Sequence, residues 1–190
     1  MKYFKKIVDL PCYDLYSVLE DMKNKNIIDT NTFFRDQICL NSIESAPDNV
    51  ALGRGSLYYD WDNLVEVNGK MTVPLRDVPL EETDFTVLCN QFKGTEFEDV
   101  YNNLSSRYVL GRVRIMRSKP KTCMTWHVDT STRIHYPVKT QEGCFMVIED
   151  EVMHIPNNTW WWTDTIASHT AFNGSSEDRL HLVAVVLGEL

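Results

Sequence analysis

The sequence predicts a mainly β fold with flanking helices, in the class of double-sheet jelly rolls. Two observations support this prediction. After Tyr108, apolar residues fall into short runs separated by turn-forming residues, so that eight candidate strands follow one another. Before Tyr108, apolar residues recur at helical spacing. A chain of 190 residues is most simply one domain, here with a mixed helical and strand part (1–107) packed on a jelly-roll core (108–190).

The N-terminal part is expected to contain three helices and one strand. A helix should begin after Thr95, because Thr95 and Glu98 have capping-box spacing and an apolar stripe follows them. Gly94 is a stop signal for the helix before it. The other ranges expected are a helix at 15–22, a helix at 85–92 preceded by the acidic run 81–84, and a strand at 57–59.

The C-terminal part is expected to fold back and forth across two sheets. Turn residues such as Asn157, Asn158 and the pair Asn173-Gly174 separate its apolar runs. This arrangement is the double-stranded β-helix of cupin-like proteins. The expected strands are 109–117, 125–128, 133–138, 144–149, 152–155, 160–163, 169–172 and 180–187.

The net charge of −8 and the isoelectric point near 5.1 disfavour nucleic acid and anionic membranes as partners. One segment, 107–121, is instead basic and contains no acid. Arg112 and Arg114 share one face of the expected strand, while Val113 and Ile115 share the other. Two interpretations remain open, a solvated strand face or a wall that attracts an anion.

Cysteine usage favours a reducing, cytoplasmic setting. The number of cysteines is odd, and they lack the paired spacing of metal ligands. The apolar run at the N-terminus is too short for a secretory signal, and no run approaches the ~20 apolar residues of a membrane span. The cysteines are Cys12, Cys39, Cys89, Cys123 and Cys144.

Two histidines, one aspartate and one arginine form the candidate site. His127 and Asp129 lie two residues apart, so a strand places them on the same face, and His169 follows forty residues after Asp129. Two imidazoles and one carboxylate on one face of Fe(II) form the ligand set of non-haem iron oxygenases. Arg179 offers a forked partner for a carboxylate-bearing co-substrate. The alternative is a hydrogen-bonded His127–Asp129 pair with His169 as an ordinary loop histidine.

The segment from Lys119 to Leu187 resembles the aspartyl/asparaginyl β-hydroxylase branch of the Fe(II)- and 2-oxoglutarate-dependent oxygenases. The resemblance implies His127 and His169 as iron ligands, and Arg179 as the group that binds the distal carboxylate of 2-oxoglutarate. It also implies that Arg133 and His135 line the co-substrate pocket. The matching residues are Pro120, His127, Arg133, His135, Glu142-Gly143-Cys144, Asp164, His169 and Arg179-Leu180.

One position departs from this branch. Its mammalian-type hydroxylases lack the carboxylate ligand and have glycine where this chain has Asp129. The present site thus resembles the three-ligand form, with His127, Asp129 and His169 as catalytic metal ligands. His154 and His181 match no motif position, and we expect both to be structural. Tyr58, Tyr59 and Trp61 are candidates for the rim of the site.

These features together predict a dioxygenase that uses Fe(II), 2-oxoglutarate and dioxygen to hydroxylate an amino-acid-like or peptidyl substrate. Two alternatives from other classes remain. One is a cupin-like isomerase or hydrolase that binds zinc, nickel or manganese, which would not require Arg179. The other is a non-catalytic jelly-roll binding module in which the histidines are incidental. The sequence carries no signal for the oligomeric state.

Overall fold

The computed structural model describes residues 1–28, 36–61 and 63–190. Its helices are α1 (Leu15–Asn24) and α2 (Glu96–Ser105), with single 3₁₀ turns η2 (Glu82–Asp84) and η3 (Asn90–Phe92). The strands are β1 (Phe4–Ile7), β2 (Gln37–Cys39), β3 (Asn41–Ser42), β4 (Val65–Val67), β5 (Lys70–Thr72), β6 (Val87–Leu88), β7 (Tyr108–Ser118), β8 (Thr122–Cys123), β9 (Thr132–Lys139), β10 (Cys144–Ile148), β11 (Glu151–Met153), β12 (Trp160–Thr163), β13 (His169–Asn173) and β14 (Arg179–Glu189).

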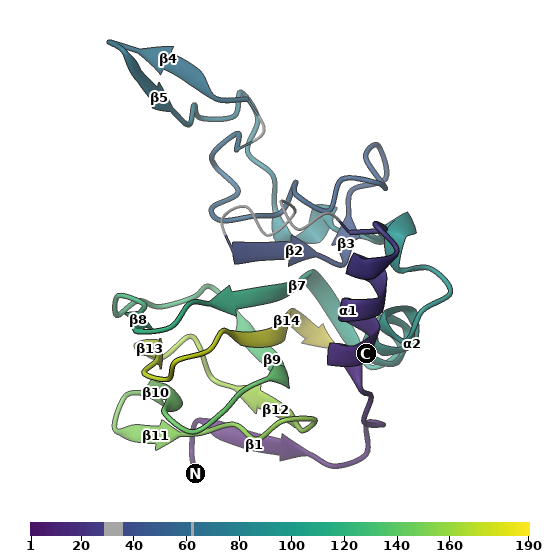
Figure 1. Cartoon of the computed structure of the whole chain (residues 1–190), viewed down its shortest axis with the longest axis vertical. Helices are drawn as coiled ribbons and strands as arrows, with labels where there is room; N and C mark the ends of the chain where they lie inside the picture. The colour runs from purple at the N-terminus through teal and green to yellow at the C-terminus, as the bar shows by residue number, and fades with distance from the viewer. Residues whose placement is uncertain (29–35, 62) are drawn as a thin grey trace.

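Two sheets form the body of the described part of the chain (Figure 1). The larger sheet has the strand order β1-β12-β9-β14-β7-β2, and the smaller has the order β11-β10-β13-β8. The strands from β7 to β14 therefore divide equally between the two sheets, while β1 and β2 extend the larger one. This topology confirms the predicted double-stranded β-helix, and the expected strands other than 125–128 form within two residues of their predicted ends.

The two faces of the larger sheet have different environments. Because side chains alternate along a strand, β14 directs Leu180 and Leu182 to one face and Arg179 and His181 to the other. The apolar face packs against α1 and α2 and forms the main hydrophobic core. The polar face is turned toward the smaller sheet, and it is this face that carries the candidate site.

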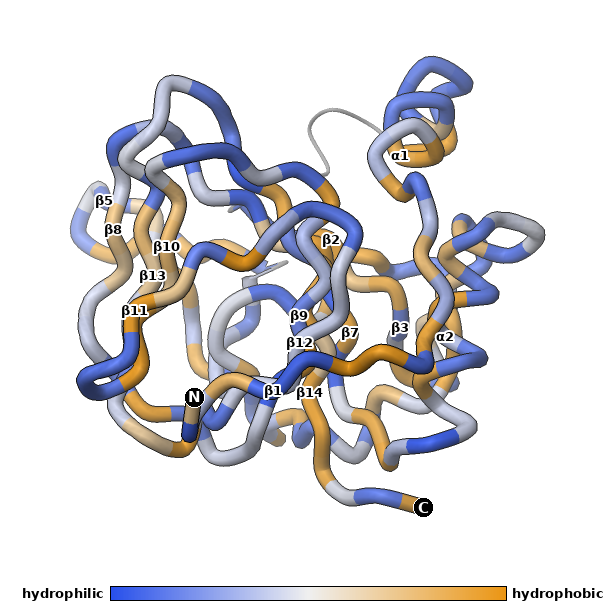
Figure 2. Tube along the Cα trace, turned by 90° about the horizontal axis from the view of Figure 1, so that it is seen from below, coloured by the Kyte–Doolittle hydropathy of each residue, from blue (hydrophilic) through white to orange (hydrophobic). Residues whose placement is uncertain are grey.

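Both helices that cover the core begin at side-chain caps. The Asp14 carboxylate accepts from the Ser17 N–H at the start of α1, and the Thr95 hydroxyl accepts from the Phe97 N–H at the start of α2. In Figure 2, α1 is orange on the side turned toward the body and blue on the opposite side. These caps and amphipathic faces confirm the helices predicted at 15–22 and after Thr95.

Two predictions for the N-terminal part are wrong. The segment 85–92 forms β6 and η3 instead of one helix, because Leu88 pairs with Asn41 and the Cys89 N–H donates to the Leu40 carbonyl. Pairing with another strand here outweighs local helix propensity. The segment 57–59 makes turns, with a single bridge from Tyr59 to Leu75 in place of a strand.

The strand predicted at 125–128 is also wrong. The short strand β8 ends at Cys123, which pairs with Phe172, and the next bridge joins His127 to His169. Between these two pairings the chain advances four residues from Cys123 to His127 but only three from His169 to Phe172. The segment before His127 therefore contains one extra residue, which interrupts the ladder as a β-bulge does. The segment still follows β13, since the Met124 N–H donates to the Ala171 carbonyl.

Several strands in the first hundred residues were not expected from the sequence. β1 pairs with β12 along the edge of the larger sheet, and its Phe4 is buried. β4 and β5 form a hairpin that projects from the body (Figure 1), joined by a turn in which Asn68 and Gly69 both have positive φ. Among the described helices, none has the length and apolar character needed to cross a bilayer.

Candidate metal and co-substrate site

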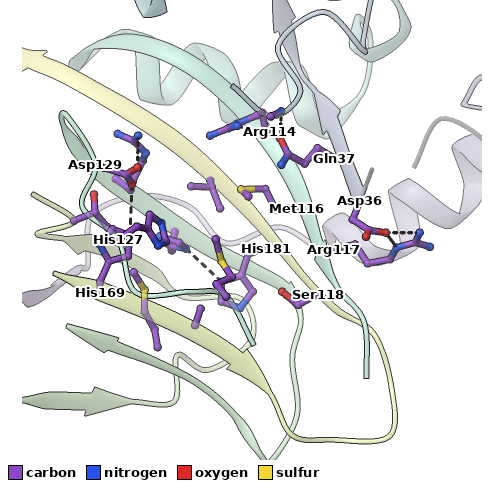
Figure 3. Close-up of a pocket in the computed structure, with 18 of the residues that line it drawn as sticks. Asp36, Gln37, Arg114, Met116, Arg117, Ser118, His127, Asp129, His169 and His181 are labelled. Atoms are coloured by element: carbon purple, nitrogen blue, oxygen red, sulfur yellow. Dashed lines mark hydrogen bonds and ion pairs between the residues drawn. The ribbon is translucent and has the colours of Figure 1, made fainter. Parts of the chain in front are cut away.

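A cavity of about 800 Å³ lies against the polar face of the larger sheet. One wall comes from β7, β9 and β14, and the opposite wall comes from β13 and the segment that follows β8 (Figure 3). The wall from the larger sheet is basic, with Arg114, Arg133 and Arg179 among its side chains. Met116 and Met146 add apolar surface. The cavity therefore combines donors for anions with a partly apolar lining, as ligand sites commonly do.

Backbone hydrogen bonds bring His127, Asp129 and His169 together. The His127 N–H donates to the His169 carbonyl at 3.0 Å, and the His169 N–H donates back to the His127 carbonyl at 2.9 Å. The Asp129 N–H donates to the Thr165 carbonyl at 2.9 Å. The extra residue before His127 does not separate the group, because pairing with β13 resumes at this point.

The side chains of these three residues converge on one point (Figure 3). One ligand atom from each residue lies within 4.8 Å of the others. The His169 Nε2 is 3.6 Å from the Asp129 Oδ2, and the two imidazole rings have a centroid separation of 4.2 Å. Two imidazole nitrogens and one carboxylate oxygen at these separations fit Fe(II) or a similar divalent cation.

Each imidazole has its second nitrogen occupied by a backbone carbonyl. The His127 Nδ1 lies 2.8 Å from the Thr125 oxygen, and the His169 Nδ1 lies 3.0 Å from the Ala167 oxygen. A carbonyl accepts hydrogen bonds only, so both rings carry a proton on Nδ1, which leaves Nε2 as the nitrogen that can face a metal. Metal-ligating histidines are typically oriented in this way. Burial also lowers the pKa of His169, which favours the neutral ring that a metal binds.

Arg179 lies buried in the same cavity without a carboxylate partner among the described residues. Its guanidinium contacts His181, at 3.0 Å from Nε to Nε2, and His181 in turn lies 3.4 Å from His135. Burial lowers the pKa of Arg179 to about 10, so the group stays positively charged at neutral pH. A buried charge is normally paired, which makes an anionic ligand the expected partner.

Arg112 and Arg114 also face the cavity, but they differ in how many of their guanidinium N–H groups have hydrogen-bond partners. Every nitrogen of the Arg112 guanidinium has a partner: Nε and Nη2 donate to the Glu82 carboxylate, with Nη2 2.6 Å from Oε1, and Nη1 donates to the carbonyls of Gly53 and Gly55. Arg114 donates from Nη1 to the Gln37 Oε1 at 3.0 Å, while its buried Nε has no hydrogen-bond partner among the described residues. Burial, and next the charge of Arg112, lower the pKa of Arg114 to about 10.

The structure places all six predicted site residues in the lining of this one cavity, namely His127, Asp129, His169, Arg179, Arg133 and His135. Arg133 occupies a place that the sequence did not suggest, since its Nη2 lies 3.3 Å from the Asp129 Oδ1. Of the three candidate rim residues, Tyr58 lines the cavity.

Sequence reasoning missed His181, which lines the cavity although we expected it to be structural. The available signal was its position two residues after Arg179, which puts both side chains on one face of a strand. His154 lies outside the cavity lining, with its Nδ1 2.8 Å from the Cys144 carbonyl.

The basic segment 107–121 divides between two environments. Arg112 and Arg114 face the cavity, and Val113 and Ile115 lie in the core, as the alternation predicted. Arg107 pairs with Asp9, while Arg117 and Lys119 both contact Asp36 at the edge of the cavity. The segment is therefore neither a continuous anion-attracting wall nor a solvated face.

Comparisons with known proteins give one family match. The profile of the family described as aspartyl/asparaginyl beta-hydroxylase matches residues 81–187, more than half of the chain. A protein from Rhizobium meliloti (strain 1021) named L-proline cis-4-hydroxylase is 33% identical over 76 residues, which cover 37% of this chain and 27% of that protein. The match thus spans about a quarter of the length of this curated relative.

Solved structures with a similar fold are distant in sequence. The viral collagen prolyl hydroxylase of Paramecium Bursaria Chlorella virus-1 has a TM-score of 0.49 at 10% identity, over 97% of this chain and 94% of that one. A cupin domain from Bordetella pertussis has a TM-score of 0.36 at 13% identity, over 42% of this chain and 81% of that one.

Proposed function

Because the chain belongs to the aspartyl/asparaginyl beta-hydroxylase family, we propose that it is an Fe(II)- and 2-oxoglutarate-dependent dioxygenase that hydroxylates an amino-acid-like or peptidyl substrate. One observation carries the proposal beyond family membership. The same cavity holds a convergent His-Asp-His set and a buried arginine without an acidic partner among the described residues. A metal-binding isomerase or hydrolase needs the first feature but not the second.

His127, Asp129 and His169 would hold the iron through two Nε2 atoms and one carboxylate oxygen. Arg179 would bind a carboxylate of 2-oxoglutarate through its forked guanidinium, and His135 lies beside it. When bound, the iron and 2-oxoglutarate supply the oxidation, in which 2-oxoglutarate becomes succinate and carbon dioxide and dioxygen provides the hydroxyl oxygen. The chain orients these groups, and the apolar side chains of Met116 and Met146 help to exclude water.

We infer further that the substrate carries a carboxylate, which Arg114 binds. The guanidinium of Arg114 is buried, charged at neutral pH and only partly bonded, by Gln37. Its position on the cavity wall makes it a donor for a second anion. A free amino acid offers one carboxylate of this kind, and the relative from Rhizobium meliloti is named for a reaction on L-proline.

We also propose that the enzyme works in the cytoplasm and that residues 1–190 fold as one unit. All five cysteines are free, which suits a reducing compartment. The main core joins residues of α1 and α2 to residues of β7, β9 and β14, so the N-terminal part supports the sheet that carries the site.

Anaerobic binding of Fe(II) and 2-oxoglutarate tests the proposal. We expect a weak visible charge-transfer band that requires both components, and succinate release when dioxygen and a suitable amino acid are added. The band should be lost in Asp129→Ala and retained in His154→Ala, because His154 lies outside the cavity lining. A wild-type protein that binds the metal but shows neither the band nor succinate would favour the isomerase or hydrolase class.

A further inference from the structure

Gln37 lies beside Arg114 on the cavity wall, and a hydrogen bond joins the two side chains (Figure 3). The Gln37 Oε1 accepts from the Arg114 Nη1 at 3.0 Å and from the Gly55 N–H at 3.1 Å. A guanidinium and a backbone N–H can only donate, so the amide atom between them must be the oxygen. The two partners therefore set the orientation of the Gln37 amide, and its NH₂ group takes the opposite position.

The Gly55 peptide is itself held on both sides. Its N–H donates to Gln37, and its carbonyl accepts from the Arg112 Nη1 at 2.8 Å. Gly55 has a φ of +58°, and a Cβ at this position would lie 2.9 Å from the indole nitrogen of Trp61, so the turn requires glycine. The partner that orients the Gln37 amide is thus fixed in place.

Gln37 and Arg114 together present hydrogen-bond donors and no acceptor to a ligand. The two hydrogen bonds that the Gln37 Oε1 accepts use both of its lone pairs. Among the described residues, the Gln37 Nε2 and the Arg114 Nε and Nη2 have no hydrogen-bond partner. Arg114 also carries a full positive charge at neutral pH, because its pKa is about 10. A group that binds here must therefore accept hydrogen bonds, and a negative charge favours it.

A carboxylate meets both conditions. Each of its oxygens accepts hydrogen bonds, and its charge complements that of Arg114. A carboxamide of the same shape has one oxygen and one NH₂ group, and this NH₂ group would face donors. A polar group without a partner in such a site lowers affinity, so the site should distinguish the two ligands.

Gln37 and Gly55 lie outside the residues that match the family, 81–187, so family membership assigns them no role. In Figure 3, Gln37 and Arg114 also lie apart from His127, Asp129 and His169. The pair is therefore a part of the cavity that is separate from the metal ligands, and one of its two side chains comes from β2 in the N-terminal part.

We propose that Gln37 is a specificity-determining residue: with Arg114 it forms a donor-only subsite that binds a carboxylate of the primary substrate and disfavours the corresponding carboxamide. That the occupant is the primary substrate rests on the proposed function. The donor-only character does not, because it follows from the contacts of Gln37 in the protein without ligand.

A titration that needs no turnover provides the first test. In metal-free protein with ¹⁵N in its glutamine side-chain amides, we expect acetate to shift the Gln37 amide resonance and acetamide to leave it in place. The chain has three glutamines, so the spectrum of Gln37→Met assigns the signal. Gln91 and Gln141, which lie outside the cavity lining, are internal references. A Gln37 resonance that both compounds shift equally, or that neither shifts, overturns the proposal.

A charge at position 37 provides the second test. Gln37→Glu keeps an acceptor for the Gly55 N–H, but replaces the donor with a carboxylate oxygen that pairs with Arg114. For the free amino acid that gives the fastest succinate release, KM should rise about tenfold to a hundredfold, the effect of losing hydrogen bonds to a charged group. The ratio of kcat/KM for this amino acid to kcat/KM for its carboxamide should fall, while the Kd for 2-oxoglutarate stays unchanged.

Two further variants separate the lost donor from the added charge. Gln37→Met removes the donor without adding a charge, so KM should rise less than in Gln37→Glu. Thr72→Glu adds the same charge on the exposed strand β5 and should leave both KM and the ratio unchanged.

These results separate the two proposals. If no free amino acid gives succinate, the proposed substrate class fails, whereas the acetate titration still decides whether the subsite selects a carboxylate. If Gln37→Glu and Gln37→Met both keep the wild-type ratio and the wild-type Tm, Gln37 has no role in specificity.

Discussion

The Arg133 guanidinium lies against the Asp129 carboxylate, with 3.3 Å between Nη2 and Oδ1. The Nη1 of Arg133 is held by three acceptors, the Ser131 carbonyl, the Ser131 hydroxyl and the Thr132 carbonyl. The guanidinium is thus fixed in place and leaves the Asp129 Oδ2 directed toward His169. Resemblance alone implied that Arg133 lines the co-substrate pocket, whereas this contact indicates that it orients the carboxylate of Asp129, a proposed metal ligand.

Arg133→Met is therefore expected to weaken metal binding more than co-substrate binding. Loss of a group that orients a metal ligand typically costs about 10-fold to 100-fold in metal affinity. Fe(II) affinity measured anaerobically, beside the Kd for 2-oxoglutarate at saturating metal, separates the two effects. Arg107→Met is the matched control, since Arg107 pairs with Asp9 and does not line the cavity. A larger effect on 2-oxoglutarate than on Fe(II) would return Arg133 to the role implied by resemblance.

His127→Ala, Asp129→Ala and His169→Ala should each lose Fe(II) affinity and succinate production while they remain folded. The three side chains lie on the cavity wall outside both hydrophobic core clusters, so their removal leaves the packed core intact. Metal content after dialysis and circular dichroism check both parts. If any one of these variants keeps wild-type iron affinity, the residue that it replaces is not a metal ligand.

Partial activity in Asp129→Gly would mean that two histidines suffice to bind the iron in this scaffold, as in the mammalian-type hydroxylases of the family.

The jelly roll was predictable from sequence because its strands are separated by strong turn signals. The convergence of His127, Asp129 and His169 was also predictable, but for a reason that is only partly correct. His127 and Asp129 were expected to share a face of one strand, whereas a one-residue insertion ends the ladder before them. They converge because pairing with His169 and Thr165 resumes beyond the insertion. Spacing along the chain gives no indication of such an insertion.

Contacts that depend on tertiary structure were not predictable. The acidic run at 81–84 has the composition of a helix start, but Glu82 instead pairs with Arg112, thirty residues later. The position of His181 beside His135 was likewise hidden, because no motif marks His181 and only the packing of β14 against β9 brings the two residues together. In both cases the decisive partner lies on another strand or turn.

Arg179→Ala is expected to raise the Kd for 2-oxoglutarate far more than it changes Fe(II) affinity. Removing one partner of a buried ion pair costs about 3–5 kcal/mol, which corresponds to roughly two to three and a half orders of magnitude. Arg179→Lys should recover only part of the affinity, because a point charge does not replace the fork. Anaerobic titration measures both constants. An unchanged Kd in Arg179→Ala would transfer the assignment to Arg114.

Glu82→Gln should destabilise the protein at neutral pH. It should also make the free energy of unfolding depend less on pH in the acid range. Burial acts to raise the pKa of Glu82, but the hydrogen bonds and charge of Arg112 outweigh it and hold that pKa below its usual value. The pair therefore stabilises the fold above the unfolded-state pKa of about 4.3, and this contribution is lost as the pH falls through the folded-state pKa. The loss at pH 7 should be about 3 kcal/mol, since Arg112 is left without its acid.

Urea unfolding as a function of pH measures the effect of Glu82→Gln. The difference in unfolding free energy between wild type and variant should be largest near pH 7 and shrink below about pH 4. Glu66→Gln, on the exposed β4–β5 hairpin, is the control and should show no difference. Parallel pH profiles for wild type and Glu82→Gln would contradict the pKa direction.

Arg114→Leu should raise the KM for the primary substrate while it leaves the Kd for 2-oxoglutarate unchanged. Among the described residues its guanidinium has one side-chain acceptor, Gln37, and so remains available for a carboxylate. Succinate release with free amino acids, peptide pools and oligonucleotides at physiological salt identifies the class of substrate. We expect turnover with amino acids or peptides, because a net charge of −8 opposes the approach of a polyanion. Stimulation by oligonucleotides alone, with affinity that falls steeply as salt rises, would instead identify a nucleic acid substrate.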